Sequence, residues 1–307
     1  MSLIAERELP IRTRGETDWH GLSVSVDSAE GAQQKPASED AMASDNQSQA
    51  VRQTVDGELI HWARPVRELR VSDVPQGAIN LNVDGSVVVS PLQGFGALWQ
   101  KTYRVHLNGL AISPAAVMQT WKEHFPEFQP AENRFFPPLS GIEPGAVVLI
   151  NGKVPPAPGL PSLLPVAGGV LVLYADETSF TVMTHEGFPE AGWNTFSTYE
   201  ENGHTVAQVQ TLARAADPIY EFWFRFLGSS AQQDKTWTHV LTALANYVGG
   251  REVHLETHKV LLDPTLQWSQ AKAIWRNAGV RTMLYLLGEP VRWAERSVRA
   301  ELAKRMG

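Results

Sequence analysis

Residues 112–130 read ISPAAVMQTWKEHFPEFQP and carry a complete set of helix signals. Ser113 is a residue type that caps helix N-termini, and Pro114 suits the first helical position. From Val117 to Phe125 a large apolar residue recurs at every fourth position, which is the spacing of one helix face. A proline follows and ends the pattern, so we predict one short helix with a single buried face.

Strand-like runs surround this helix. They are rich in Val, Leu, Thr and aromatic residues, and they lie at 83–91, 97–109, 146–150, 168–174, 179–184, 191–200 and 204–215. Short turn signals separate the later runs, and such brief loops can join only antiparallel neighbours. Two helices are predicted next, at 217–228 and 234–248, followed by a strand at 251–262. The order predicts an α+β protein built on an antiparallel meander.

A strand, the helix within 112–130, a meander and a long amphipathic helix occur in the order of the helix-grip fold. Residues 112–130 resemble a passage common in the superfamily of lipid-transfer domains, polyketide cyclases and birch-pollen allergens. Residues 170–184 (VLVLYADETSFTVMT) and 191–221 (AGWNTFSTYEENGHTVAQVQTLARAADPIYE) are similar to an uncharacterised plant and bacterial branch of it. The resemblance covers about residues 85–250. It implies a curved antiparallel sheet wrapped around the helix at 234–248, and its motifs support a fold more than an activity.

Three segments are expected along the chain. Residues 31–49 are small and polar and bury too little surface to offset their ordering entropy, so we predict a disordered or loosely attached tail over 1–56. Residues 57–250 form the expected helix-grip domain. Residues 251–307 form an expected strand plus a basic helical extension, because the stretch from Pro264 onward holds eight Lys and Arg against three Asp and Glu.

The composition excludes several classes of protein. The sequence has no cysteine, which removes disulfides and thiolate chemistry. A formal net charge of −7 argues against whole-surface binding to nucleic acid. No uninterrupted apolar run approaches the roughly 20 residues of a spanning helix. Glu6, Arg7 and Glu8 stand where a signal peptide needs an apolar run, so a cytoplasmic location is expected.

The resemblance implies that the protein binds or transports a hydrophobic small molecule or lipid in an internal cavity, without catalysis and without a cofactor. Trp237, Leu241 and Leu244 share one apolar stripe of the helix at 234–248 and are expected to face the ligand.

The predicted hairpin before the two helices is expected to supply the remaining ligand contacts. Trp193 and Tyr199 share one face of its first strand, and Gln208 and Gln210 lie together on its second. Amide side chains in an apolar neighbourhood need hydrogen-bond partners, so these two are expected to orient the polar end of a ligand.

Because successive side chains of a strand point to opposite faces, two alternative interpretations remain open for the predicted strands. The glutamine face of the hairpin is solvated if Ala207 and Val209 point inward instead. In the last predicted strand, His254, Glu256 and His258 point to one face and have the residue types of a zinc or iron(II) site. A polar outer face explains the same pattern, so no metal is expected.

Two other functions also fit the sequence. A polyketide-cyclase-like enzyme requires a titratable group inside the cavity, such as Tyr199 or a histidine. A docking protein has a cavity filled by its own side chains and binds a membrane or a partner through its basic segment 264–307.

Overall fold

The computed structural model describes residues 60–154, 163–226, 229–250 and 254–288. The chain divides into two units, Met1–Val51 and Arg52–Gly307, and all of the described residues belong to the second. The tail predicted over residues 1–56 therefore lies outside the described residues, and so does the chain from residue 289 onward.

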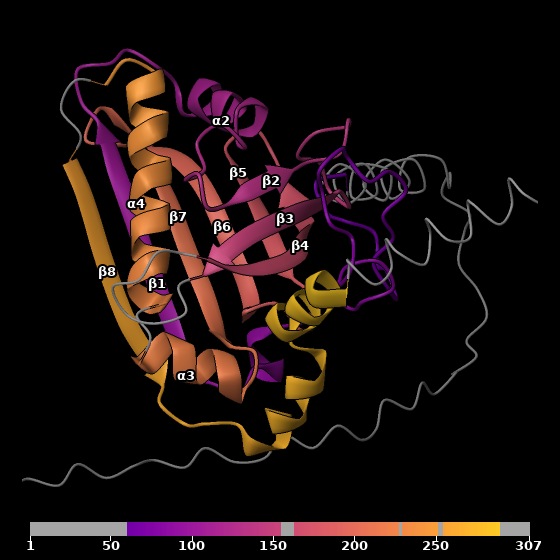
Figure 1. The fold of residues 1–307 in the computed structure, drawn as a ribbon. Coiled ribbons are helices and arrows are strands. Elements are labelled where there is room, and N and C mark those ends of the chain that lie inside the picture. The colour runs from indigo at the N-terminus through magenta and orange to yellow at the C-terminus, as the bar shows by residue number, and fades with distance from the viewer. Residues whose placement is uncertain (1–59, 155–162, 227–228, 251–253, 289–307) are drawn as a thin grey trace, which may run out of the picture. The chain divides into compact units, whose positions relative to one another are not determined.

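One eight-stranded antiparallel sheet dominates the described part of the chain (Figure 1). Its strand order is β2-β3-β4-β5-β6-β7-β1-β8. The strands are β1 (Leu98–Leu107), β2 (Arg134–Phe136), β3 (Val147–Val154), β4 (Leu164–Ala175), β5 (Ser179–Thr184), β6 (Glu190–Glu201), β7 (His204–Ala215) and β8 (His254–Asp263). From β2 to β7 each strand pairs with the next one along the chain, so the predicted meander is confirmed.

Two helices, α2 and α4, pack on one face of this sheet, where α4 runs in front of β1 and β7 (Figure 1). The helical segments are η1 (Pro91–Gln93), α2 (Pro114–Glu123), α3 (Pro218–Phe226), α4 (Ser229–Tyr247) and η2 (Trp268–Arg276), and residues 278–288 are also helical. The α+β helix-grip arrangement expected from the sequence is therefore the fold observed. None of the helices in the described ranges is both long and apolar enough to cross a bilayer.

Helix α2 forms where its signals predict it. The Ser113 hydroxyl accepts a hydrogen bond from the backbone N–H of Ala116, and Pro114 occupies the first turn. Val117 and Trp121 are fully buried because they project from the helix face that packs on β6 and β7.

The strand predicted at 83–91 is wrong. Val88 makes one isolated bridge with His185, and the neighbouring Val89 N–H donates to the Thr184 carbonyl. The chain then turns into η1 at Pro91, which has no N–H to extend a ladder. A β-branched run thus failed to become a strand because no partner lies beside it for more than one bridge.

An aromatic cluster fills the space between α2, α4 and the sheet. The rings of Phe180 and Phe196 stack with centroids 4.4 Å apart. Trp121 and Trp237 each meet Phe196 edge-on, at 5.4 and 5.5 Å. One core thereby joins both helices to β5 and β6.

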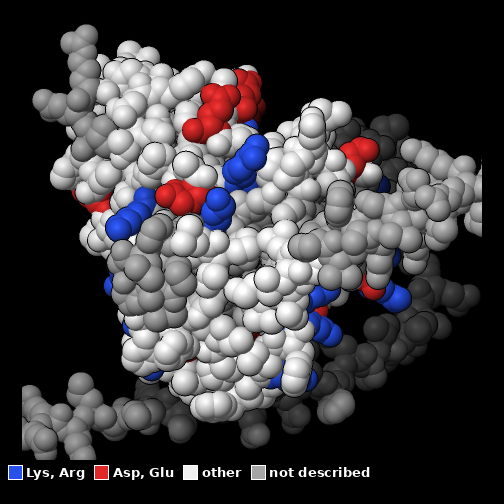
Figure 2. Space-filling model, viewed as in Figure 1, with Lys and Arg blue, Asp and Glu red and all other residues white. Residues whose placement is uncertain are grey.

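Strand β8 extends this sheet beyond the expected end of the helix-grip domain. It pairs with β1 along its whole length, from Leu98 opposite Asp263 to His106 opposite His254. Strand β1 precedes residue 250 and β8 follows it, and the two strands are neighbours in one sheet. On the face of the molecule drawn in Figure 2, charged side chains form small mixed groups and much of the surface is uncharged.

The residues after η2 are anchored by buried hydrogen bonds. Asn277 donates from its amide to the Asp217 carboxylate at 2.7 Å. The Thr282 hydroxyl accepts from the Asn82 amide and from the Ala167 backbone N–H, both at 3.1 Å. Asn277 and Thr282 are almost completely inaccessible to solvent. This part of the extension therefore belongs to the folded body.

His185 lies at the end of β5 and is completely buried. Neither of its ring nitrogens has a hydrogen-bond partner among the described residues. Burial lowers the pKa of this imidazole to about 4, and the positive charge of Arg281 adds to the effect. His185 is therefore neutral in the folded protein near pH 7.

Candidate functional site

A cavity of about 180 Å³ lies between the sheet, α3 and the first half of α4. Its wall is mainly aromatic and aliphatic, because most of the side chains that β3 to β6 direct into it are apolar. The aromatic members include Phe125, Phe180, Phe196, Trp223, Phe224 and Trp237. Such a space favours an apolar molecule.

The helix residues expected to face the ligand are divided between this cavity and the core. Trp237 lines the cavity. Leu241 and Leu244 lie further along α4 and are fully buried in the core. The apolar stripe therefore identified the buried face of α4. Of its three residues expected to face the ligand, Trp237 alone borders the cavity.

The strand residues expected at the site, Trp193, Tyr199, Gln208 and Gln210, lie on the opposite face of the sheet. They do not line the cavity. Gln208 instead accepts a hydrogen bond from the Arg104 guanidinium at 2.8 Å.

The two faces of the hairpin are therefore the reverse of those expected. The residues that alternate with these four along β6 and β7 are the buried ones. Asn194, Phe196 and Thr198 are buried on β6, and Ala207 and Val209 are buried on β7. The alternative with the two small apolar residues of β7 inward is thus the observed arrangement. The aromatic residues of β6 were a poor guide, since they occur on both of its faces.

One part of the cavity wall is polar. Glu190, at the start of β6, and Gln233, in the first half of α4, face each other there. The Gln233 amide donates to both carboxylate oxygens of Glu190, at 2.7 and 2.9 Å. Asn194 and Thr236 border the cavity as well, and the Asn194 amide oxygen accepts from the Thr211 hydroxyl at 2.6 Å.

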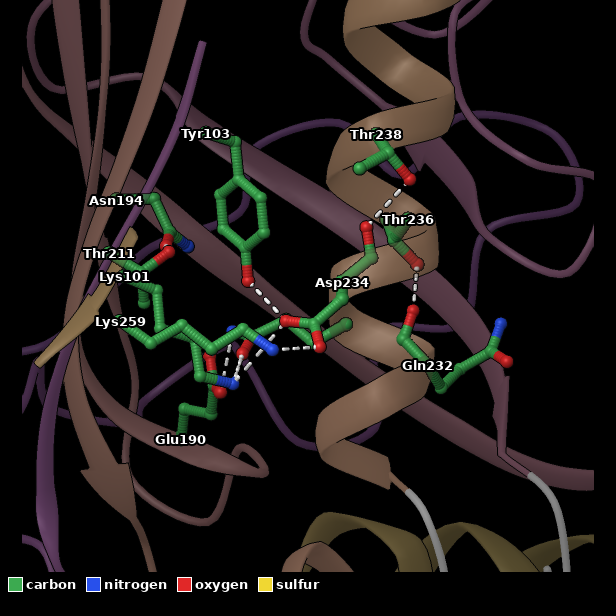
Figure 3. A network of polar contacts seen from close by, with 11 residues as sticks. Lys101, Tyr103, Glu190, Asn194, Thr211, Gln232, Asp234, Thr236, Thr238 and Lys259 are labelled. Atoms are coloured by element: carbon green, nitrogen blue, oxygen red, sulfur yellow. Dashed lines mark hydrogen bonds and ion pairs between the residues drawn. The ribbon is translucent and has the colours of Figure 1, made fainter. Parts of the chain in front are cut away.

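Lys101 sets the orientation of this amide. Its ammonium donates to the Gln233 side-chain oxygen at 2.6 Å. Since an ammonium group can only donate, the Gln233 oxygen must face Lys101 and the nitrogen must face Glu190. A chain of polar contacts thus runs from β1 through α4 to β6 (Figure 3).

Asp234 forms the second half of this network. It accepts a hydrogen bond from the Tyr103 hydroxyl at 2.6 Å and pairs with the ammonium of Lys259, on β8 (Figure 3). Burial, with the nearby Asp234 carboxylate, raises the pKa of the Tyr103 hydroxyl, which therefore stays protonated. The network joins α4 to both β1 and β8, so the extension helps to position the helix.

Burial acts in opposite directions on the two charged groups near the cavity. It raises the pKa of the Glu190 carboxyl, against the opposing effects of Lys101 and Gln233. It also lowers the pKa of the Lys101 ammonium, while Glu190 and Asp234 oppose the change. Glu190 lines two partly open hollows, where the surrounding side chains desolvate its carboxylate.

A second hollow of about 310 Å³ borders the same polar wall. Glu190, Gln233 and Phe224 line both hollows and thus form a partition between them. The second hollow has a charged lining that includes Lys101, Arg214 and Glu221. The partition therefore separates a mainly apolar space from one whose apolar lining also carries several charged side chains.

The sequence contained a signal for this site. On β1, Lys101 projects from the same face as the buried residues Tyr103 and Val105. On β6, Glu190 projects from the same face as Asn194 and Phe196. A charged residue on the buried face of a strand indicates a buried charge, and a buried charge needs a partner. Gln233 had no comparable signal, because it lies before the apolar stripe of α4.

The histidine pattern of β8 lies away from the cavity. His254 and His258 are exposed, and their rings approach Glu256 at 3.6 and 3.9 Å. His106 on β1 approaches the same carboxylate at 3.5 Å. Within the described ranges, no group of three or more His, Asp or Glu side chains is arranged to hold a metal ion.

No family model matches this chain, and no curated protein matches it. The solved structure of the KanY protein is similar at 14% identity, covering 54% of this chain and 99% of that chain with a TM-score of 0.37. Major latex-like protein 151 from Panax ginseng is 10% identical, with 50% and 99% covered and a TM-score of 0.34. Ara h 8.0201 is 13% identical, with 49% and 97% covered and a TM-score of 0.33. These scores are low, so the functional argument rests on the site alone.

Proposed function

We propose that this protein binds a small apolar molecule in the cavity between the sheet, α3 and α4. The observation that carries the proposal is a partly open hollow of about 180 Å³ against an otherwise packed aromatic core. Protein interiors rarely leave voids larger than a water molecule. An unfilled apolar space of this size therefore suits a ligand better than a purely structural core.

The volume limits the size of the ligand. An apolar cavity of about 150 Å³ is enough for one benzene ring, whereas sites for drug-sized ligands occupy about 300–1,000 Å³. The cavity here is closer to the first case. The proposed ligand is thus one ring or two fused rings, rather than a two-chain lipid.

Native mass spectrometry of the protein purified from bacteria tests the proposal directly. A co-purified apolar molecule of low mass, released on unfolding, is the expected result. Titration with naphthalene, followed by ligand-observed NMR, provides a second test with a defined probe. A protein that carries no such molecule and does not bind naphthalene would contradict the proposal.

Filling the cavity should abolish binding. Val182 on β5 lines the cavity, and Val182→Phe places a ring in the space that the ligand needs. We expect naphthalene affinity to fall by about tenfold or more, which corresponds to losing most of the contact area. The dissociation constant from NMR titration is the measurement.

Thr181→Phe is the matched control for this substitution. Thr181 is the preceding residue of β5, and its hydroxyl meets that of Thr195 on the outer face of the sheet. The control variant should bind naphthalene as the parent does. Equal affinities for both variants would place the ligand somewhere else.

The enzyme alternative is favoured by one observation. It requires a titratable group in the cavity, and Glu190 is such a group. The mass of the recovered ligand separates the two functions. A molecule that is released with the mass at which it was supplied indicates binding, whereas conversion that depends on Glu190 indicates catalysis.

Peripheral contact with an anionic bilayer is a second candidate function, favoured by the exposed side chains of the extension. Trp268 and Trp275 are 72% and 84% exposed. Residues 264–288 carry three basic side chains and no acidic one. Around α3 and η2 the face drawn in Figure 2 is largely uncharged, with basic side chains at its margin. Tryptophan beside cations is typical of a membrane-interface surface.

Replacing both exposed tryptophans tests this candidate without removing the anchored residues after η2. We expect the double variant Trp268→Ala, Trp275→Ala to lose about tenfold in affinity for vesicles containing phosphatidylserine, because interfacial burial of each indole is lost. Vesicle co-sedimentation is the measurement, and vesicles of phosphatidylcholine alone are the control. Undiminished sedimentation of the double variant would contradict the candidate.

A further inference from the structure

Glu190 is the acidic side chain among the described residues that line the apolar cavity, and its hydrogen bonds with Gln233 leave part of its acceptor capacity for a ligand. Its carboxylate accepts two hydrogen bonds from the Gln233 amide. Acceptance at both oxygens beside the Lys101 ammonium suits the ionised form and opposes the effect of burial, which raises the pKa of this carboxyl. A carboxylate offers about four acceptor positions, so the amide occupies roughly half of them.

The neighbouring Asp234 is better provided with partners. It accepts from the Tyr103 hydroxyl and pairs with Lys259. It does not line the cavity. Glu190 is bonded by the neutral Gln233 amide and lies near the Lys101 ammonium, and it is the carboxylate of the two that faces the ligand space.

Much of the wall near Glu190 is apolar, although Asn194 and Thr236 also border the cavity. Phe188 and Pro189 precede it in the chain, and Phe224 and Trp237 line the cavity as well. An apolar ligand with one polar substituent would lose hydrogen bonds to water unless that substituent reached the polar wall. A carboxylate accepts hydrogen bonds and repels anions, so it selects the kind of substituent.

We infer that the cavity binds a ring compound whose hydrogen-bond-donating substituent, such as a phenolic or alcoholic hydroxyl, donates to the Glu190 carboxylate. This inference rests on the proposed function, because it adds the chemistry of the polar end to an apolar ligand. The partition formed by Glu190, Gln233 and Phe224 marks where the ring ends and the polar substituent begins.

Three probes with the same ring system test the inference. Naphthalene, 2-naphthol and 2-naphthoate differ only in having no substituent, a hydroxyl or a carboxylate. With the full-length protein at neutral pH, 2-naphthol should bind about tenfold more tightly than naphthalene, the gain typical of one hydrogen bond to a charged group. 2-Naphthoate should bind more weakly than either, because its charge meets that of Glu190.

Glu190→Gln keeps the size of the side chain and removes its charge. In this variant the advantage of 2-naphthol over naphthalene should shrink to about threefold or less, and 2-naphthoate should gain affinity. Glu200→Gln is the matched control, because Glu200 is an exposed glutamate on the same strand. It should leave the order of the three probes unchanged.

The outcomes separate this inference from the proposed function. Failure of naphthalene to bind overturns both. Binding of naphthalene without a preference for 2-naphthol overturns the inference alone. Preferred binding of 2-naphthoate would also overturn it and would instead assign the polar end of the ligand to Lys153, a cation that lines the cavity from β3.

Discussion

Replacing Trp121 by alanine is expected to lower the free energy of unfolding by about 3–5 kcal/mol, the usual cost of removing a buried indole. Trp121 is fully inaccessible and joins α2 to the rings of Phe180 and Phe196. Both phenylalanines line the cavity, so the substitution should also loosen its wall. Chemical denaturation with guanidinium chloride measures the change.

Two further variants show where the effect originates. The Trp121 indole N–H is buried without a partner among the described residues, so Trp121→Phe removes an unsatisfied donor as well as some contact area. Its cost should remain below about 2 kcal/mol. Trp275→Ala removes an exposed indole and should change stability by less than about 0.5 kcal/mol. A loss below about 1 kcal/mol for Trp121→Ala would contradict the packing of α2 on the sheet.

Lowering the pH from 7 to 4 is expected to remove about 3 kcal/mol of stability through His185, in proportion to the depression of its pKa from 6.5 to about 4. Between these two values the unfolded chain binds a proton at this position and the folded chain does not. Falling pH therefore favours unfolding across this window, and the contribution is fully lost below about pH 4. Denaturation curves recorded at several pH values measure it.

Substituting the imidazole identifies its share of the pH dependence. His185→Phe cannot titrate, so its stability should fall less steeply than that of the parent between pH 6.5 and 4. His239→Phe is the control, because His239 is exposed on α4. It should keep the slope of the parent. Parallel curves for the parent and His185→Phe would show that this histidine is not the responsible group.

The succession of elements could be predicted because most boundaries carry a chemical signal of their own. The cap at Ser113 and the turn that contains Gly203 are local features, and β5 and β7 begin and end at the predicted residues. The residues at 83–91 show the limit of this approach. Their β-branched side chains favour a strand, but strand formation depends on a partner that lies far away in the sequence.

The inward face of a strand was harder to predict than the strand itself. A change of one residue in register exchanges the two faces, so an error moves every side chain at once. On β6 both faces carry aromatic residues, and Trp193 and Tyr199 are on the outer one. The contrast of Ala207 and Val209 with Gln208 and Gln210 on β7 was the better guide, because the face with Ala207 and Val209 carries only small or apolar side chains.

The polar wall could not be assembled from the sequence. Lys101, Glu190 and Gln233 come from β1, β6 and α4, and only the tertiary arrangement brings them together. Each is a common surface residue type. Their significance arises from burial, which the sequence indicates only through the phase of neighbouring apolar residues.

Within the described part of the sheet, β8 pairs on one side only, with β1. Its outer edge therefore presents unpaired backbone groups, beside the exposed aliphatic side chains of Val260, Leu261 and Leu262. An open edge of this kind is a template on which another chain adds as a further strand. Self-association at high concentration should thus begin at β8, and a lysine introduced among these three positions would improve solubility without touching the ligand cavity.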